Sequence, residues 1–395
     1  MKQLKIAHFM DDGIFPISAY ELFEAVAPKC NDFFIASKPH SLKFVKYIPV
    51  KFVHKLSFIN PLFLKSLEQY DFVVLHSLNL FNRQLVQHSD PSRVTFVWIG
   101  MGFDYYDLIF ESAESLLLDK TREIAAGARN GQPRWRWFLK QLLPLPLSSF
   151  IATKRNAIKR NAIKKIHYFS PVLENEHKLV KRKCEPPFPS YIPWNYSSNA
   201  KIIDRDCALE NTVMGRNILL GNSATPTNNH IEIIDFLSHI DLYGKKIICP
   251  LSYGNQKYAD FIIKYADNKL GEGFVPIRDF LPLEDYTSLI SNCSIVIMNH
   301  VRQQGVGNAD AMLAKGAKVF LREENPLFQL YKSKGIKVFK IQDLEADPSL
   351  LFEDMAKKAL ENNKKILKQF RGMEIKITMT KNLIEQCCAS KSRIR

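Results

Sequence analysis

One stretch in the second half of the chain shows the alternation of strand and helix most plainly. Residues 294–298 form an uninterrupted apolar run, and residues 306–315 carry the pattern of a helix that ends at Gly316. A second apolar run follows at residues 318–321, so the pattern predicts a strand, a helix and another strand. Between them lie the polar loop and its glycines: Ser294-Ile295-Val296-Ile297-Met298-Asn299-His300-Val301-Arg302-Gln303-Gln304-Gly305-Val306-Gly307-Asn308.

The same alternation continues on both sides of this stretch. Six apolar runs and five helical patterns share about 125 residues, as a doubly wound Rossmann-like domain requires. The expected strands are residues 217–220, 246–249, 273–275, 294–298, 318–321 and 337–341.

The first half shows a looser version of the same pattern. Strands are expected at residues 4–10, 33–37, 72–76, 94–99 and 166–169, and the proline-rich stretch 185–198 is typical of a linker. We therefore predict an α/β protein of two Rossmann-like domains that face a cleft, followed by C-terminal helices. The expected domains are residues 1–198 and 199–345, and residues 346–395 are expected to form the C-terminal helices.

Composition excludes several classes of protein. The chain has 395 residues, 46% of them hydrophobic, and this excludes a disordered or collagenous chain. Its seven cysteines show no disulfide or metal-binding spacing, so we expect a reduced cytoplasmic protein that needs no metal or other cofactor. A formal net charge of +15 predicts an anionic partner. We see no apolar run long enough to span a bilayer, so any membrane contact should be peripheral.

Most of the excess positive charge lies in residues 134–183, which contain thirteen lysines and arginines and only two glutamates. Tryptophans and leucines alternate with these basic residues, an arrangement that suits the surface of an anionic leaflet on the inner face of the bacterial membrane. A solvated helix face is the plainer alternative, and the absence of spaced aromatic residues argues against nucleic acid. The proposed membrane residues are Trp135, Arg136, Trp137, Lys140, Lys154, Arg155, Lys159 and Arg160.

Ligands of parallel sheets bind beyond the carboxyl ends of the strands, so the loops after the strands are the candidate sites. After residues 217–220 come Gly221, Asn222 and Ser223, whose small side chains let backbone amides approach an anion. A structural alternative is a capping box formed by Asn229 and Glu232 at the start of the next helix.

The loop after residues 294–298 is the stronger candidate. Its glycines would expose the amides of a helix N-terminus, and an arginine would offer a two-pronged contact to a diphosphate. A tight turn with a solvated arginine is the alternative. The predicted binding residues are Arg302, Gln303, Gln304, Gly305, Gly307 and Asn308.

Two further loops complete the predicted donor site. Asn325 and Pro326 define the start of a helix, which leaves Glu323 and Glu324 in the preceding turn, where a carboxylate can accept hydrogen bonds from sugar hydroxyls. Compensation of the helix dipole would explain the same glutamates. In another loop, Tyr253 is placed to stack on or hydrogen-bond a ligand, although its Gly-Asn turn needs none.

The first half offers candidates for a general base. In order of preference they are Asp12, His8 and Asp104, each near or just beyond the carboxyl end of an expected strand. A carboxylate or imidazole at the cleft can deprotonate an acceptor hydroxyl. Taken singly, each is equally typical of a turn or a cap.

Three of these motifs, in the same order and spacing, resemble a known family. They are Gly221-Asn222-Ser223 with Asn228-Asn229-His230, then Arg302-Gln303-Gln304-Gly305-Val306-Gly307, then Arg322-Glu323-Glu324-Asn325-Pro326. The family is that of the TDP-N-acetylfucosamine:lipid II N-acetylfucosaminyltransferases of enterobacterial common antigen assembly. The resemblance implies a GT-B fold, a nucleotide-sugar donor on the second domain and a polyprenyl-diphosphate-linked acceptor at the first.

We therefore expect a metal-independent glycosyltransferase that moves 4-acetamido-4,6-dideoxygalactose from a TDP-sugar to a lipid-linked saccharide. A transferase that uses a UDP- or GDP-sugar for O-antigen or capsule synthesis remains an alternative. A protein that binds a phosphorylated glycan without turning it over is a third.

Overall fold

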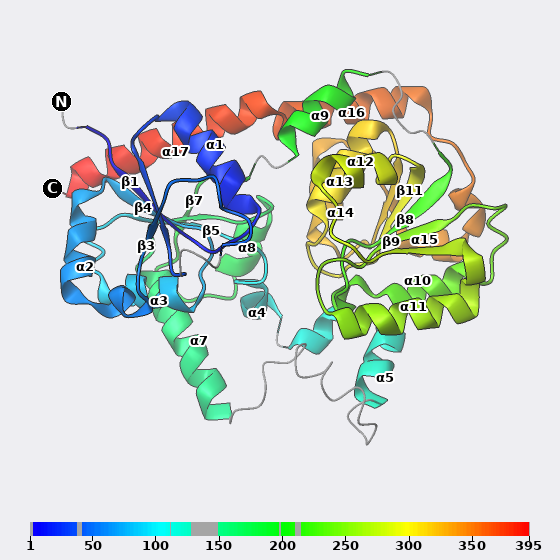
Figure 1. The fold of residues 1–395 in the computed structure, drawn as a ribbon, viewed down its shortest axis with the longest axis horizontal. Coiled ribbons are helices and arrows are strands. Elements are labelled where there is room, and N and C mark those ends of the chain that lie inside the picture. Colours follow the sequence, from blue (N-terminus) through cyan, green and yellow to red (C-terminus); the bar gives the residue numbers. More distant parts are fainter. Residues whose placement is uncertain are drawn as a thin grey trace. The chain divides into compact units, whose positions relative to one another are not determined.

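The computed structural model describes residues 3–37, 42–110, 112–127, 149–196, 199–209 and 215–394. The chain divides into two compact units (Figure 1). Unit 1 comprises residues 1–109, 147–200 and 371–395, and unit 2 comprises residues 110–146 and 201–370. These units differ from the continuous domains expected from the sequence, since residues 112–127 pack with unit 2 and the last helix packs with unit 1.

Unit 2 is built on a six-stranded parallel sheet in the order β10-β9-β8-β11-β12-β13. Chain order reverses between β8 and β11, which is the arrangement of a Rossmann fold. The six expected strands are all present: β8 (Asn217–Leu220), β9 (Ile247–Pro250), β10 (Phe274–Ile277), β11 (Cys293–Met298), β12 (Lys318–Leu321) and β13 (Phe339–Lys340).

Helices cover both faces of this sheet (Figure 1). One face buries a core to which α10 and α11 contribute isoleucines, such as Ile234 and Ile262, against strand residues such as Ile218 and Ile297. The helices of the unit are α5 (Asp119–Gly127), α9 (Ala200–Cys207), α10 (His230–Leu237), α11 (Gln256–Leu270), α12 (Leu283–Ile290), α13 (Val306–Lys315), α14 (Pro326–Lys334), α15 (Ile341–Ala346) and α16 (Lys357–Arg371). Short 3-10 turns are η4 (Ala113–Leu116), η5 (Pro226–Asn228), η6 (Gly271–Gly273) and η7 (Pro348–Leu351).

Unit 1 repeats this plan with a seven-stranded parallel sheet in the order β3-β2-β1-β4-β5-β6-β7. The five expected strands are present, and two short ones at the edges were not expected. The strands are β1 (Ile6–Met10), β2 (Asn31–Ile35), β3 (Val50–Phe52), β4 (Phe72–Leu75), β5 (Phe96–Ile99), β6 (Tyr168–Ser170) and β7 (Ser190–Tyr191).

Two helices far apart in sequence share one face of this sheet. Phe23 of α1 (Phe15–Val26) and Leu383 of α17 (Met373–Ile394) belong to one buried cluster with Ile6 and Val74. On the opposite face, Phe9 of β1 contacts Phe58 of η2 (Lys55–Ile59) and Phe63 of α2 (Pro61–Ser66). The remaining helices are η3 (Leu67–Gln69), α3 (Leu80–His88), α4 (Tyr106–Ile109), α7 (Ser149–Lys164) and α8 (Glu176–Lys181).

Candidate functional site: a polar edge on unit 2

The loops that follow β8 and β11 lie side by side because these two strands are paired in the sheet. This is the point where the strand order reverses, the usual ligand-binding position in such sheets. Gly221 begins the first loop with a φ of +68°, and a Cβ there would lie 2.7 Å from Oδ1 of Asn228. Glycine is therefore required at this position for both its conformation and its size.

Asn228 is the centre of the first loop. Its Nδ2 donates to the carbonyl of Ser223 at 3.0 Å and to Oγ1 of Thr225 at 2.8 Å, which fixes the orientation of the amide. Its Oδ1 therefore accepts, from the backbone N–H of Asn222 at 2.9 Å and from Nε2 of His300 at 2.8 Å. The asparagine is fully buried and holds the loop in one conformation.

His300 connects this loop to the one after β11. Because Nε2 donates to Asn228, the neutral ring keeps Nδ1 as an acceptor, and Nδ1 is buried with no hydrogen-bond partner in the described part of the chain. Burial lowers the pKa of His300 well below its usual value, with nearby Arg302 acting in the same direction. His300 is thus uncharged at neutral pH.

Gln304 joins the two loops a second time. Its Nε2 donates to Oγ1 of Thr225 at 2.9 Å and to Oδ1 of Asn222 at 3.1 Å, while its Oε1 accepts from Oγ1 of Thr227 at 2.7 Å. Both ends of the side-chain amide are therefore used in fixing the two loops together. The sequence placed Gln304 in direct contact with a ligand, and the structure shows it supporting the loops.

Helix α13 begins directly after Gln304. Gly305 occupies the N-cap position with a φ of +67°, and a Cβ there would lie 3.2 Å from Cβ of Asn222. A glycine N-cap has no side chain to accept from the first-turn N–H groups, which leaves that turn suited to an anion. Arg302 precedes it, and one of its Nη atoms donates to the carbonyl of Gln303 at 2.9 Å.

The other predicted residues of this loop are arranged differently. Gln303 is buried. Asn308 donates from Nδ2 to the hydroxyl of Tyr286 at 2.8 Å, so its side chain contacts α12. Gly307 lies within the first turn of α13. Of the predicted set, Arg302 and the glycine-containing helix start fit anion binding best.

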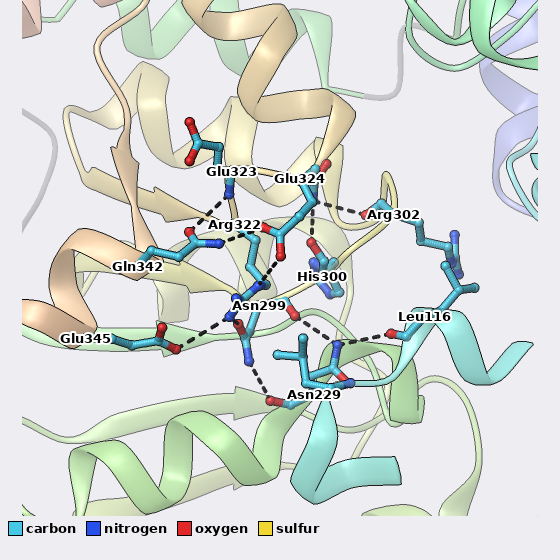
Figure 2. Close-up of polar contacts among 12 residues, drawn as sticks. Leu116, Asn229, Asn299, His300, Arg302, Arg322, Glu323, Glu324, Gln342 and Glu345 are labelled. Atoms are coloured by element: carbon cyan, nitrogen blue, oxygen red, sulfur yellow. Dashed lines mark hydrogen bonds and ion pairs between the residues drawn. The ribbon is translucent and has the colours of Figure 1, made fainter. Parts of the chain in front are cut away.

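A second set of contacts extends the site to the loop after β12 (Figure 2). Asn299 is fully buried, and its Nδ2 donates to the carbonyl of Asn229 at 2.9 Å. Its Oδ1 accepts from Arg322 at 3.2 Å, and the same guanidinium lies 3.2 Å from Glu324 and 3.4 Å from Glu345. Loops from β8, β11 and β12 are thus joined into one polar edge.

The two predicted glutamates lie at this edge and already have partners. Glu323 pairs with Lys340 at 2.7 Å. Glu324 accepts from Gln342 at 2.6 Å and also contacts Arg322 (Figure 2). Burial would raise the pKa of Glu324, but a backbone hydrogen bond, Arg322 and Gln342 outweigh it and hold that pKa below its usual value. Glu324 is therefore available to a ligand only as an ionised acceptor.

Asn325 is confirmed as the N-cap of α14, since its Oδ1 accepts from the N–H of Leu327 at 2.9 Å. Its Nδ2 also donates to the carbonyls of His300 and Arg302, both at 3.0 Å (Figure 2). Asn325 therefore positions the β11 loop, including the backbone of Arg302.

Tyr253 lies on the loop after β9. Its carbonyl accepts from the N–H of Ala224 at 2.7 Å, which attaches this loop to the one after β8. Its ring is 74% exposed and therefore accessible to a ligand.

The capping box considered for Asn229 and Glu232 is wrong. Asn229 has left-handed backbone angles, and its Oδ1 accepts from the N–H of Leu118 at 3.0 Å. Glu232 instead accepts from the N–H of Thr121 at 2.8 Å and its hydroxyl at 2.7 Å. These two residues bind the segment around α5 to unit 2, a long-range role that a local motif could not reveal.

His8, predicted as a base in the first half, is fully enclosed in unit 1. Its Nε2 lies 3.2 Å from Oδ1 of Asn31, and its Nδ1 lies 3.1 Å from Nε2 of His76, whose Nδ1 contacts the hydroxyl of Tyr196 at 2.9 Å. Asn31 donates through Nδ2 to Glu24 and Ala27, so His8 donates to Asn31 and accepts from His76. Burial lowers the pKa of His8 to about 3. Its role is structural, which corrects the prediction.

Asp104 is also corrected, because it is buried with all its hydrogen bonds inside unit 1. Its carboxylate accepts from the backbone N–H of Leu78 at 2.7 Å, from that of Met101 at 2.8 Å and from the indole of Trp98 at 2.7 Å. Burial raises the pKa of Asp104 above its usual value despite these donors. Asp104 holds two loops in place and has no access to an acceptor.

Asp12 keeps a partly exposed carboxylate and stays a prediction as the base. It accepts from the backbone N–H groups of Lys43, Phe44 and Val45 at 2.5, 2.9 and 3.0 Å. Burial would raise the pKa of Asp12, but these donors and Lys46 keep it below its ordinary value.

Most of the predicted membrane residues lie outside the described part of the chain: Trp135, Arg136, Trp137 and Lys140, together with the side chains of Lys154 and Arg155. Lys159 corrects the prediction, because its side chain is buried and pairs with Asp107. Arg160 donates to the carbonyl of Lys183 at 2.9 Å. Within the described ranges we find no helix long and apolar enough to cross a bilayer.

Several contributors to the polar edge were not among the predicted site residues, including Thr225, Thr227, Asn228, Asn299, His300 and Arg322. For the first four, the signal in the sequence is the clustering of small polar residues after two strands, which also suits an ordinary turn. Across the described residues, no three His, Cys, Asp or Glu side chains are grouped to hold a metal ion. The edge as built suits an anionic ligand held by backbone amides and an arginine.

Several solved structures share this fold. HepE from Anabaena, solved in complex with UDP and glucose, is 13% identical with a TM-score of 0.64, covering 98% of this chain and 100% of that chain. Sucrose-phosphate synthase from Thermosynechococcus elongatus is 13% identical with a TM-score of 0.61, again covering 98% and 100%. The lipopolysaccharide outer core galactosyltransferase WaaB, in its apo form, is 9% identical with a TM-score of 0.59, covering 97% and 99%.

Two Rossmann-like parallel sheets and these likenesses define the fold of the chain, which is the GT-B fold. Residues 157–369 match the 4-alpha-L-fucosyltransferase family, glycosyl transferase group 56, and the chain belongs to it. The family resemblance seen in the three sequence motifs is thereby confirmed.

Proposed function

We propose that the enzyme transfers 4-acetamido-4,6-dideoxygalactose from its TDP-linked form to a polyprenyl-diphosphate-linked saccharide in surface polysaccharide assembly. The observation that carries the proposal is the double connection of the β8 and β11 loops through Asn228 and Gln304. It presents the first turn of α13, with Arg302 before it, at the point where the strand order of unit 2 reverses. A diphosphate fits such a position because both its charges meet oriented N–H donors.

In the proposed reaction, the bond between the anomeric carbon and the diphosphate oxygen breaks, and the acceptor oxygen forms a new bond to that carbon. The electron pair of the broken bond leaves with TDP, whose growing negative charge is stabilised by Arg302 and the α13 N-terminus. The acceptor proton passes to Asp12, provided that the reaction inverts configuration at the anomeric carbon. Glu323 and Glu324 accept hydrogen bonds from the donor sugar.

A UDP-sugar is the second candidate donor. HepE was solved with UDP and with UDP-glucose, which are ligands of that protein and share the diphosphate that the polar edge of unit 2 suits. The TDP-sugar and the UDP-sugar differ in their nucleobase. A GDP-sugar is a third candidate, and the same experiment tests it.

Thermal unfolding with TDP, UDP or GDP tests the donor. We expect TDP to raise the melting temperature most, because a ligand that binds only the native state stabilises it. Transfer from the TDP-sugar to a polyprenyl-diphosphate saccharide should then be measured by product mass. A larger shift with UDP or GDP would replace TDP in the proposal, and the absence of a shift with all three would reject a nucleotide donor.

We also propose that the enzyme works as a peripheral protein on the inner face of the cytoplasmic membrane, where a lipid-linked acceptor is presented. The charge of residues 134–183 supports this location. The protein should sediment with anionic vesicles at low salt and be released at high salt, since screening weakens such binding.

A further inference from the structure

Part of the surface of unit 1 exposes large apolar side chains to solvent. Tyr47 is 94% exposed, Leu56 65%, Leu62 80% and Ile59 46%. They follow one another along the loop after β2, η2 and α2, and Phe52 on the edge strand β3 is exposed beside them in sequence. Several exposed apolar side chains in one short segment indicate a candidate interaction site. We name the exposed residues of positions 43–65 the basic apolar face.

The same segment also has buried side chains, and these account for its folding without the exposed ones. Phe58 is buried with its ring centroid 5.6 Å from that of Phe9 and 5.5 Å from that of Phe81, and Leu64 is buried as well. The N-terminus of α2 is also capped, since the side chain of Asn60 accepts from the N–H groups of Leu62 and Phe63. Hence the exposed leucines and isoleucine point away from the core that η2 and α2 help to form. In Figure 1, α2 lies at the outer edge of unit 1.

The charge around these apolar residues is entirely positive. From residue 33 to residue 67 the sequence contains six lysines and neither aspartate nor glutamate. Five of the lysines are described, and all five are exposed: Lys43, Lys46, Lys51, Lys55 and Lys65.

Two acidic residues that lie next to the segment, Asp32 and Asp12, already have partners within the protein. Asp32 contacts Lys51 at 2.8 Å and accepts from the hydroxyl of Tyr70, and the oxygens of Asp12 accept from three backbone amides. Nζ of Lys55 lies 5.6 Å from the ring centroid of Phe81, a cation–π contact. The segment therefore combines exposed apolar side chains with an excess of positive charge.

We propose that the basic apolar face docks on the surface of an anionic lipid bilayer. Leucine, isoleucine and tyrosine side chains would enter the boundary between headgroups and acyl chains, and the lysines would contact the anionic headgroups. A protein partner would also cover apolar residues, but the excess of lysines, with neither aspartate nor glutamate from residue 33 to residue 67, favours a surface of uniform negative charge. This deepens the membrane location proposed above, and it rests on a different part of the sequence from residues 134–183.

The test is sedimentation of the full-length protein with vesicles of phosphatidylcholine plus phosphatidylglycerol, and with vesicles of phosphatidylcholine alone. We expect binding to the anionic vesicles, and a loss of about tenfold or more in the partition coefficient for Leu56→Ser/Leu62→Ser. Lys55→Gln/Lys65→Gln should lose a similar factor at low salt and less at high salt. Matched controls in unit 2 are Phe280→Ser/Leu283→Ser and Lys264→Gln/Lys332→Gln, which should bind as the wild type does.

Hydrogen exchange locates the contact independently of residues 134–156. Peptides that cover residues 43–66 should gain protection when anionic vesicles are added. Unchanged exchange there, or equal vesicle binding by the face variants and the wild type, overturns the proposal. So does light scattering that shows the face variants dissociating an oligomer while vesicle binding stays the same. No sugar substrate is present in these measurements, so the docking proposal and the transfer proposal fail separately.

Discussion

The hydroxyl of Thr227 donates to Oε1 of Gln304 at 2.7 Å, across 77 residues of sequence, and so joins the loops that follow two neighbouring strands of unit 2. Both residues are at least nine-tenths buried. The hydrogen bond is strong because water is excluded and because Nε2 of the same glutamine is also satisfied. Donor binding should therefore depend on Gln304 even though its amide is not free for a ligand.

Replacing Gln304 with alanine should lower both stability and nucleotide affinity. Thr225 and Thr227 lose their partner in a buried place, which costs about 1–3 kcal/mol in the free energy of unfolding. Urea unfolding and nucleotide titration measure the two effects. Gln369→Ala, an exposed glutamine on α16, is the control. Unchanged affinity in the Gln304 variant would show that the loops keep their arrangement without this amide.

Gly305→Ala tests the close approach of α13 to Asn222. Alanine costs about 1–2 kcal/mol in a left-handed conformation, and its Cβ would also lie 3.2 Å from Cβ of Asn222. Gly244→Ala is a matched control, because φ there is +74° with no atom within 4 Å of the added Cβ. The conformational cost cancels between the variants. Nucleotide affinity should fall for Gly305→Ala alone, and an equal fall in both would contradict crowding at Asn222.

Arg302→Ala should lower kcat/KM for sugar transfer by about 100-fold or more, the usual cost of removing a charge-stabilising donor. The melting temperature should change little, because the guanidinium is partly exposed. Arg302→Lys keeps the charge but loses the two-pronged geometry, so it should recover only part of the activity. Arg93→Ala on the surface of unit 1 is the control. Near-normal turnover of Arg302→Ala would remove this residue from the donor site.

His8 should make the protein sensitive to acid. Its pKa is lowered from 6.5 to about 3 in the folded state, so below pH 6.5 the unfolded chain binds a proton that the folded chain does not. Stability is therefore full above pH 6.5 and falls towards pH 3, by about 1.4 kcal/mol per pH unit. Urea unfolding of His8→Gln at pH 7 and pH 5 should show a smaller difference than the wild type. His88→Gln, an exposed histidine, should retain the wild-type difference, and identical slopes in all three would contradict burial as the cause.

Glu232→Gln should loosen the segment around α5. The amide oxygen can still accept from the N–H of Thr121, but an NH₂ group replaces the oxygen that accepts from the hydroxyl and the charge is lost, so stability should fall by about 1 kcal/mol. Hydrogen exchange should increase at residues 118–124 before the rest of unit 2 opens. Glu272→Gln at the surface provides the comparison. Exchange that rises evenly over the unit would mean that the segment is not a separate opening element.

Most strands of both sheets could be predicted from the sequence because buried parallel strands contain short apolar runs, as residues 218–220 and 319–321 show. The edge strands β3 and β7 escaped prediction since three and two residues are too few to show a pattern. The sequence predicted where the polar loops lie along the chain, but not which of their residues contact one another. Asn228 looks like a turn residue, and only the paired strands reveal that His300, far along the chain, meets its side chain.

The candidates for the general base show a different limit of prediction from sequence. Asp12 and Asp104 follow strands and His8 lies within β1, but position relative to a strand does not report burial. Leu78, which donates to Asp104, and His76, which lies beside His8, both come from the loop after β4. Polar residues at strand ends therefore serve loop packing as readily as catalysis, and only the tertiary contacts separate the two uses.

The placement of α17 affects how the polypeptide is made. Leu383, Ile384 and Cys387 complete the cluster that holds Ile6 and Phe23, so the first sheet lacks part of its covering until the last helix has left the ribosome. Synthesis from the N-terminus normally lets early segments fold first. Here, the apolar surface of the earliest strands waits for the final residues, and a truncated product that stops after residue 370 would leave it open to aggregation.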